Sequence, residues 1–335
     1  MILLNAIKII FLLGFLVFIH EGGHFLVAKA FKIEVKEFSI GFGPAIFSRQ
    51  GRETLYSVRA IPFGGYVNML GEAERVDKKG SFSNAKVLPR IAIVAAGGIV
   101  NIIFGIVVFF ILSLTTGENL STTIDEIMPE YKNNLQALET GDTILEIEGN
   151  SVHLKSDIDR NMQKIKSDNP ITLLIERDGK TQYVQVIPSK YEGQNYILGI
   201  KVAVPERNLK NNLYYAFWGT INFTLSMGDG LKMLFTGAVK PDKMMGPIGI
   251  SEMVAETSSL YNFVYLLSLV SLSLGVTNLL PIPALDGGRI LILIIEGIRG
   301  KALKEEIELG IQSAGFTLLI LFSLYVSYND ILRIF

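Results

Sequence analysis

Two histidines and a glutamate occupy positions 20, 21 and 24 of the stretch "FIHEGGHFLV", which is otherwise apolar. On a helix, His20 and His24 lie about one turn apart on one face, with Glu21 beside them. This H-E-x-x-H spacing predicts two zinc ligands and a general base. The alternative is a pair of hydrogen-bonded or snorkelling histidines near a membrane surface.

The composition favours a membrane partner. The chain has 335 residues, of which 49% are hydrophobic, and its formal net charge is −1. A charge so close to zero gives no indication of nucleic-acid binding. Because the chain contains no cysteine, nitrogen and oxygen atoms must hold any metal.

Four apolar segments are long enough to cross a bilayer. They comprise residues 1–31, 91–114, 260–288 and 308–328. The first continues through the histidine motif without a small-residue cleavage site, so we interpret it as a retained span rather than a signal peptide. A fifth stretch, 211–236, contains polar residues such as Asn222 and Asp229, and we expect it to be an interfacial amphipathic helix.

Positive charges next to the spans predict on which side of the membrane each loop lies. Lysine and arginine residues lie between the first two spans and between the last two, at positions 29, 32, 36, 86, 90, 289, 299, 301 and 304. Such loops are usually cytoplasmic. Residues 115–212 are therefore predicted to be extracytoplasmic, and the histidine motif is expected towards the cytoplasmic leaflet.

The extracytoplasmic segment, 120–205, has the pattern of a small β-rich domain. Residues 140–152, "TGDTILEIEGNSV", alternate between apolar and polar, and residues 171–188 form two such runs joined at Asp178-Gly179. An Asp-Gly pair between alternating runs predicts a β-hairpin. The segment also resembles the core of a PDZ domain, a module that binds extended chain ends by strand addition. A PDZ-like spacer without a ligand is the alternative.

A catalytic zinc ion usually has three protein ligands, so the motif needs a third. The one remaining histidine, His153, falls in the predicted outer domain. A carboxylate near another span must then complete the set. Asp286, in "TNLLPIPALDGGRIL", follows an apolar helix that two prolines break. Irregular backbone at membrane depth is tolerated where it is buried in protein or lines a wet cavity, although a turn at the membrane surface would also explain Asp286.

Topology links this ligand to the number of spans. If 211–236 does not cross the membrane, Asp286 and the histidine motif lie towards the same leaflet. A fifth crossing would put them on opposite sides of the bilayer. Four spans and a metal site at Asp286 thus support each other, and Glu296 is the next carboxylate to consider.

Together these motifs resemble the site-2 protease family of intramembrane zinc metalloproteases, in particular the bacterial group that cleaves anti-sigma factors. The resemblance rests on HEGGH in the first span, "NLLPIPALDGG" in the third, the PDZ-like segment between spans two and three, and "MGPIGI" at 245–250. It implies an α-helical polytopic membrane protein with four transmembrane helices. It also implies a membrane-associated β-hairpin at 34–72 and an inserted extracytoplasmic PDZ-like domain.

The same resemblance assigns roles to individual residues. His20, His24 and Asp286 would bind one Zn²⁺ ion, and Glu21 would activate the attacking water. Substrate-binding roles fall on three further residues, namely Asn278, Pro281 and Asn101. The last belongs to "AGGIVN", which is similar to the family's "AGPxxN" but has Gly98 in place of the proline.

The implied activity is hydrolysis of a peptide bond within or near the transmembrane segment of single-pass membrane proteins, such as anti-sigma factors or remnant signal peptides. The resemblance places this regulated intramembrane proteolysis in the bacterial inner membrane, on substrates already trimmed outside. One alternative, a metal or ion transporter, would require further polar residues along the spans or an internal repeat. The other, an inactive helix-binding scaffold, would not need Glu21.

Overall fold

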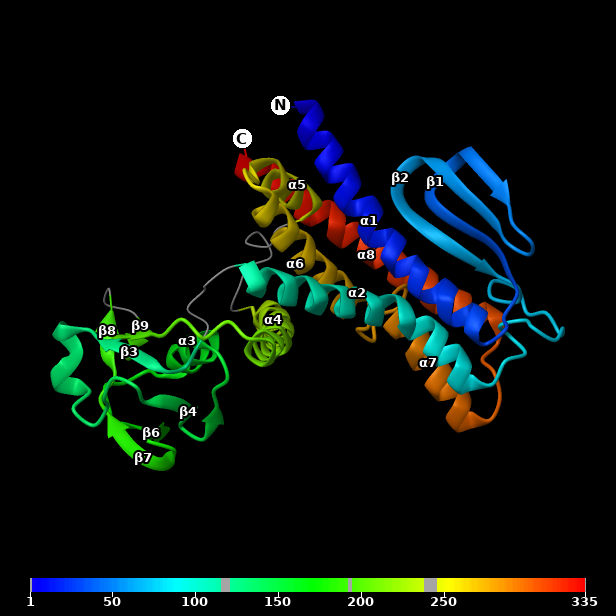
Figure 1. The fold of residues 1–335 in the computed structure, drawn as a ribbon. Helices are drawn as coiled ribbons and strands as arrows, with labels where there is room; N and C mark the ends of the chain where they lie inside the picture. The colour runs from blue at the N-terminus through cyan, green and yellow to red at the C-terminus, as the bar shows by residue number, and fades with distance from the viewer. Residues whose placement is uncertain (1, 116–120, 192–194, 238–245, 335) are drawn as a thin grey trace. The chain divides into compact units, whose positions relative to one another are not determined.

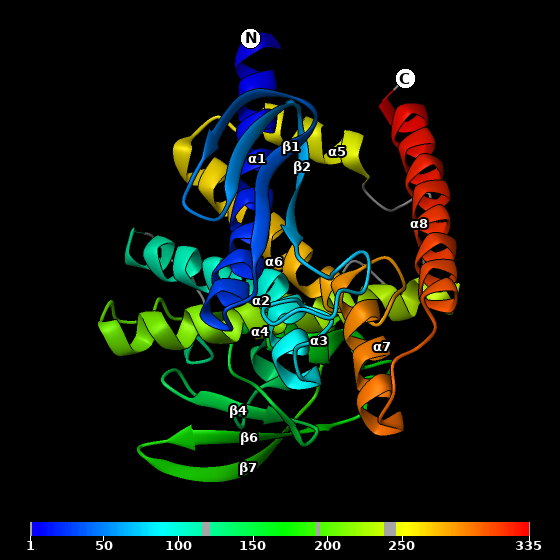
Figure 2. The ribbon, with the colours of Figure 1, turned by 90° about the vertical axis from the view of Figure 1, so that its right-hand side faces the viewer.

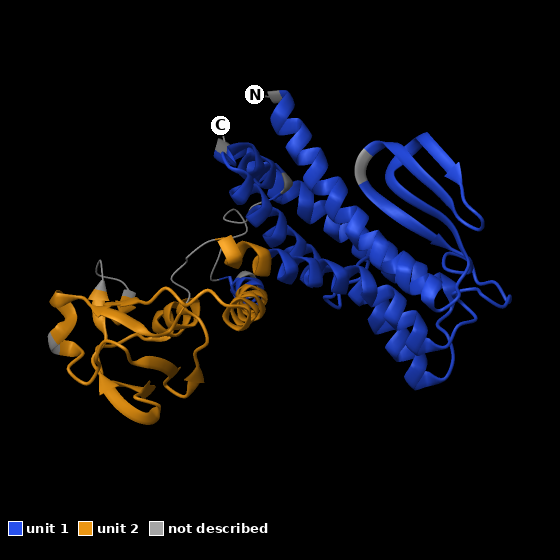
Figure 3. Ribbon diagram, in the orientation of Figure 1, with its two compact units in different colours: residues 1–108, 227–335 blue, residues 109–226 orange. Residues whose placement is uncertain are grey.

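The chain forms two compact units in a computed structural model that describes residues 2–115, 121–191, 195–237 and 246–334. Unit 1 comprises residues 1–108 and 227–335, and unit 2 comprises residues 109–226 (Figure 3). Within the described residues, four helices are long and apolar enough to cross a membrane: Leu3–Ala30, Val87–Thr115, Leu260–Asn278 and Glu305–Arg333. Four candidate spans agree with the number that the sequence predicts.

Unit 1 combines these helices with a β-hairpin and two shorter helices (Figure 1). In chain order its elements are α1 (Ile2–Ala30), β1 (Val35–Gln50), β2 (Leu55–Met69), α2 (Val87–Thr115), α5 (Pro247–Glu256), α6 (Leu260–Asn278), α7 (Asp286–Arg299) and α8 (Glu305–Ile334). Leu12 and Leu16 of α1 are buried in a core with residues of α5 and α6.

Helix α8 presents many large apolar side chains outward. Leu318, Leu321 and Leu324 are each at least 60% exposed. Exposed apolar area costs roughly 25 cal/mol per Å² in water, whereas contact with lipid tails removes that cost. The apolar surface of α8 therefore suits a bilayer.

The region 34–72 contains an antiparallel hairpin of β1 and β2. Strand β2 packs along α1, as Figures 1 and 2 show from two directions. Phe38 and Val67, which are paired across the two strands, are buried, while Ile46 and Phe47 in the second half of β1 are 73% and 62% exposed. This distribution suits an apolar part of the hairpin that meets lipid, and association with the membrane stays a prediction.

The predicted third span, 260–288, is not one continuous helix. Helix α6 ends at Asn278 and α7 begins at Asp286. Pro281 and Pro283 lack the backbone N–H that would continue α6. The next residue, Ala284, has a φ of +76°, and its N–H donates to Gln312 Oε1 of α8 at 2.6 Å.

Helix α7 was not predicted as a separate element. Its second residue, Gly287, allows the helix to begin directly beside the irregular segment, because a Cβ there would lie 2.1 Å from the carbonyl oxygen of Leu280. As a result Asp286 lies in the first turn of α7, held close to the end of α6.

Helix α5 accounts for most of the "MGPIGI" motif, whose Met245 is outside the described residues. The buried carboxylate of Asp330, in α8, accepts hydrogen bonds from the N–H groups of Gly246 and Gly249 at 3.0 and 2.9 Å. A carboxylate at a helix N-terminus satisfies free N–H groups and complements the helix dipole. The motif thus joins α5 to the end of α8.

Unit 2 is a β-rich domain followed by a long helix. Its elements are β3 (Ile124–Ile127), η1 (Pro129–Asn134), β4 (Thr143–Ile147), β5 (Asn150–Ser151), α3 (Lys155–Lys164), β6 (Ile171–Arg177), β7 (Lys180–Val186), β8 (Ser189–Tyr191), β9 (Asn195–Ile197), β10 (Ile200–Val202) and α4 (Leu209–Phe235). The main sheet has the order β5-β4-β6-β7. Asp178 and Gly179, with φ of 52° and 73°, connect β6 to β7, which confirms the predicted hairpin.

The Gly-Asp pair before β4 has a structural role. Asp142 is 1% exposed and accepts hydrogen bonds from the Glu139 N–H at 2.8 Å and from Arg177 Nε at 2.7 Å. Burial raises the pKa of the Asp142 carboxyl, but the hydrogen bonds from Arg177 and Glu139 lower this pKa by more, so that it falls below its ordinary range. The charged pair ties the loop before β4 to the end of β6.

Helix α4 covers the predicted helix 211–236, and it is not among the span-length apolar helices found in the described residues. Its polar side chains contact the rest of unit 2. Asn222 is buried and donates to Ser156 Oγ at 3.1 Å, while Arg160 donates to the Asn222 carbonyl oxygen at 2.7 Å. These contacts explain the buried Asn222 without an interface with lipid, and an interfacial position of α4 stays a prediction.

Candidate metal centre

The two motif histidines lie on one face of α1, as their spacing predicts. Both are buried, with exposed fractions of 9% and 8%. Their Nε2 atoms lie 3.3 Å apart, and their rings stand nearly perpendicular, at 85°. Both Nε2 atoms thus face one common point beside the helix.

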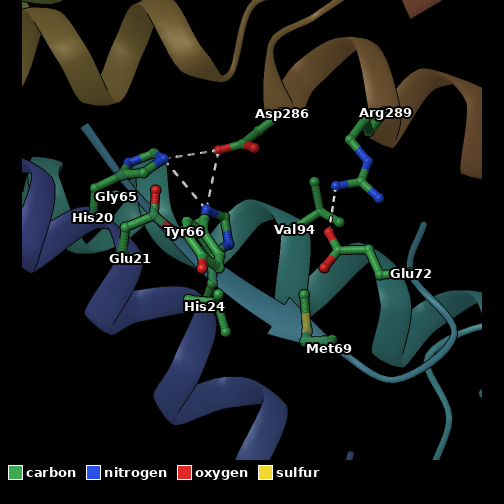
Figure 4. A pocket seen from close by; sticks show the side chains of 11 residues that line it. His20, Glu21, His24, Gly65, Tyr66, Met69, Glu72, Val94, Asp286 and Arg289 are labelled. Carbon is green, nitrogen blue, oxygen red and sulfur yellow. Dashed lines mark hydrogen bonds and ion pairs between the residues drawn. The ribbon is translucent and has the colours of Figure 1, made fainter. Parts of the chain in front are cut away.

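Asp286 completes this group from the first turn of α7. Its Oδ2 atom lies 3.2 Å from His20 Nε2 and 3.4 Å from His24 Nε2 (Figure 4). Among the described residues, His20, His24 and Asp286 form the one cluster of such side chains that could hold a metal ion. His153 lies in unit 2, where its ring stacks on Trp218 at a centroid distance of 3.4 Å.

The three atoms have the spacing that tetrahedral zinc requires. Zinc bonds of about 2.0 to 2.1 Å separate tetrahedral ligand atoms by about 3.3 to 3.4 Å. The observed edges are 3.2, 3.3 and 3.4 Å. Asp286 Oδ2 is buried and has no hydrogen-bond donor, which leaves it free to bind a cation. Two imidazole nitrogens and one carboxylate oxygen are ligands that zinc commonly takes.

Glu21 lines a cavity of about 210 Å³ together with the three candidate ligands. In Figure 4 its carboxylate points to the same side of α1 as the two imidazoles. Gly65 of β2 also lines the cavity and packs against Glu21, since a Cβ there would lie 3.2 Å from Glu21 Cγ. The cavity is large enough to hold water beside Glu21.

The predicted substrate-binding residues have different positions. Asn278, at the end of α6, lies near the cavity, with its Nδ2 atom 3.5 Å from His20 Nε2. Pro281 is exposed in the segment between α6 and α7. Asn101 is completely buried, and its Nδ2 atom lies 3.3 Å from His20 Nδ1. Substrate roles for these residues stay predictions, and the burial of Asn101 favours a role at His20.

Sequence reasoning missed two charged residues that line the cavity. Arg289, one turn after Asp286, donates to the carboxylate of Glu72, which lies just beyond β2 (Figure 4). The sequence indicated Arg289 only as a charged residue three positions after Asp286. Its partner could not be predicted, because Glu72 lies 217 positions away. Glu296, the alternative carboxylate ligand, pairs instead with Arg90 of α2 at 2.7 Å.

Helix α2 approaches the histidines through a glycine. A Cβ on Gly97 would lie 2.4 Å from His24 Nε2 and 2.8 Å from His20 Cε1. Any larger residue would push both rings away from Asp286. Glycine at position 97 therefore allows α2 to pack directly against both imidazoles.

Comparison with known proteins agrees with this geometry. The family model for peptidase family M50 matches residues 8–322. A Fusobacterium nucleatum subsp. nucleatum protein named as a "putative zinc metalloprotease" is 34% identical over 332 residues, which cover 97% of each chain. The zinc metalloprotease RasP of Shouchella clausii is 30% identical over 409 aligned positions, covering 96% of this chain and 97% of RasP. The chain therefore belongs to peptidase family M50, the site-2 protease family of membrane zinc metalloproteases, and its cofactor is zinc.

Proposed function

We propose that this chain is an intramembrane protease in which His20, His24 and Asp286 hold one zinc ion. The observation that carries the proposal is the triangle of Nε2, Nε2 and Oδ2 atoms with edges of 3.2 to 3.4 Å. The two histidines of this triangle belong to a helix of membrane-spanning length. A site so placed would act on peptide bonds within or near a membrane-embedded segment.

The proposed mechanism uses Glu21 as the general base. A bound zinc ion would polarise the scissile carbonyl and lower the pKa of water to about 7. Glu21 takes a proton from the water whose oxygen bonds to the carbonyl carbon. When the C–N bond breaks, Glu21 returns that proton to the leaving amine nitrogen. Atoms and charges balance without any other reactant.

The substrates we propose are single-pass membrane proteins, such as anti-sigma factors or remnant signal peptides. A transmembrane helix satisfies its own backbone hydrogen bonds, so it must unwind before cleavage. Strand β2 borders the cavity at Gly65 and Tyr66, and an unwound segment could add to it as a strand. Asn278 would hold the backbone next to the metal.

Mapping the cleaved bond tests this function. The full-length protein, reconstituted in liposomes with a single-pass model substrate, is expected to cut within or beside the apolar segment, as mass spectrometry of both fragments would show. Protein stripped with a chelator should be inactive and recover with added Zn²⁺. Cleavage confined to the soluble parts of the substrate would contradict an intramembrane site.

The location we propose is the bacterial inner membrane, with the described β-rich domain of unit 2 outside the cell and the metal site towards the cytoplasmic leaflet. Positive residues near the ends of α1 and α2 support this orientation, among them Lys29, Lys32, Lys86 and Arg90. Unit 2 is joined through the chain to two spans, α2 before it and α6 after it. A folded domain there suits a filter that excludes substrates with bulky outer parts.

Deleting residues 120–205, with a short flexible linker in their place, tests the filter. A steric filter discriminates without a tuned affinity, so the deletion is expected to make untrimmed substrates cleavable. Recruitment through a PDZ-like groove instead predicts poor cleavage even of trimmed ones. Adding Glu21→Gln to the deletion should abolish the new cleavage. A folded, zinc-loaded deletion variant that still spares every untrimmed substrate would disprove the filter.

A further inference from the structure

Each metal-binding imidazole must present a lone pair on the nitrogen that faces the metal. For a neutral histidine that binds through Nε2, the proton must therefore sit on Nδ1, and a hydrogen-bond acceptor at Nδ1 stabilises this tautomer. The residues that face the two Nδ1 atoms therefore influence the zinc affinity of the site.

His24 has an acceptor in that position. Its Nδ1 atom lies 2.8 Å from the carbonyl oxygen of Ile93, in α2. A backbone carbonyl can only accept, so Nδ1 of His24 must carry the proton. The Nε2 lone pair of His24 is left directed at Asp286.

His20 faces a side chain instead. The Nδ2 atom of Asn101 lies 3.3 Å from His20 Nδ1, Asn101 is 0% exposed, and its Oδ1 atom is buried without a partner. An amide has one accepting and one donating end, and their placement follows from the hydrogen bonds available. A protonated Nδ1 requires the oxygen, and a 180° turn of the amide about its last side-chain bond exchanges the two ends and brings Oδ1 to His20.

We propose that Asn101 is a positioning residue whose amide oxygen accepts the Nδ1–H of His20 and so directs the Nε2 lone pair of His20 towards the metal. The proposal rests on the metal site described under the proposed function. It assigns the two asparagines near His20 to opposite ring nitrogens. Asn101 lies at Nδ1, behind the ring, whereas Asn278 lies 3.5 Å from Nε2, on the metal side.

The packing of α2 on α6 holds Asn101 in place. Ser271 Oγ, in α6, donates to the backbone carbonyl oxygen of Asn101 at 2.9 Å. The two helices approach closely at Gly98 and Gly275, since a Cβ on Gly275 would lie 2.7 Å from the Gly98 carbonyl oxygen. Glycine at position 98 thus fits the close crossing that keeps Asn101 behind His20.

Two substitutions at position 101 test whether Asn101 acts as a hydrogen-bond acceptor or in another way. Asn101→Leu removes the acceptor, and Asn101→Asp keeps an oxygen there but cannot donate. In full-length purified protein titrated with Zn²⁺ against a competing chelator, we expect Asn101→Leu to weaken zinc binding about 10- to 100-fold, which is typical for loss of such a partner. Asn101→Asp should bind zinc close to the wild-type level.

The hydrogen bond at His20 Nδ1 is measurable in the zinc-loaded protein. The chain has three histidines, so His153→Gln leaves only the motif pair for ¹⁵N-histidine NMR. The Nδ1–H of His20 is expected to be hydrogen-bonded with Asn101 present and in Asn101→Asp, and to lose that hydrogen bond in Asn101→Leu. Ser268→Ala, which alters a buried residue of α6 that bonds within its own helix, serves as the packing control and should bind zinc like wild type.

Three results would overturn the proposal. One is a His20 Nδ1–H without a hydrogen bond in zinc-loaded protein that retains Asn101, which requires only the His153→Gln background. Another is wild-type zinc affinity in Asn101→Leu. The third is an equal loss in Asn101→Asp and Asn101→Leu, which would make Asn101 a donor or a packing residue. If wild-type protein binds no zinc, or Asp286→Ala binds it equally well, the proposed metal site fails instead.

Discussion

Glu21→Gln is expected to abolish cleavage while the protein keeps its zinc. The amide has nearly the shape of the carboxylate but cannot accept the proton of the attacking water. General base catalysis contributes roughly 10²- to 10⁴-fold to such reactions, so residual cleavage should fall by at least about 100-fold. Turnover of a single-pass model substrate and zinc content by atomic absorption should be measured on the same preparation.

Glu72→Gln is a suitable comparison for this variant. Glu72 lines the same cavity, but its carboxylate accepts a hydrogen bond from Arg289. If Glu21 is the base, Glu72→Gln should retain far more activity than Glu21→Gln. Near-normal turnover in Glu21→Gln would remove Glu21 from the mechanism and leave the ligand assignment intact.

Asp286→Ala is expected to lose both zinc and activity. Its Oδ2 atom is the third corner of the ligand triangle, and two histidines alone bind zinc weakly. The loss of affinity should exceed the roughly 10- to 100-fold that outer partners of a ligand contribute. Zinc stoichiometry after dialysis against a chelator measures it directly, without a substrate.

Glu296→Gln provides the matched carboxylate change on the same helix. Glu296 pairs with Arg90 at 2.7 Å, so its loss should leave the zinc content unchanged even if α7 packs less tightly on α2. Full zinc retention in purified Asp286→Ala would contradict the proposed ligand set.

The histidine pair and Glu21 could be predicted from the sequence because their relation is local. A spacing of four on one helix fixes which face they share. Asp286 required a different argument, namely that the chain has no cysteine and that the third histidine belongs to another domain. The structure brings Asp286 to the histidines as the four-span topology predicts.

Other parts of the site depend on contacts that sequence patterns do not contain. The apolar run after Asp286 reads like the end of a span, whereas in the structure a new helix starts at Asp286, with Gly287 packed against the carbonyl of Leu280. The role proposed for Asn101 follows from a helix crossing at Gly98 and Gly275. The pair of Glu72 and Arg289 joins distant segments, so no local pattern could predict it.

The origin of the ligands at opposite ends of the chain has a consequence for biosynthesis. The histidines emerge from the ribosome within the first helix, whereas Asp286 follows only after the outer domain and the third span. Until then the nascent protein has two ligands, which bind zinc weakly. Under the proposed ligand set, synthesis order thus delays the complete zinc site until α7 has been made.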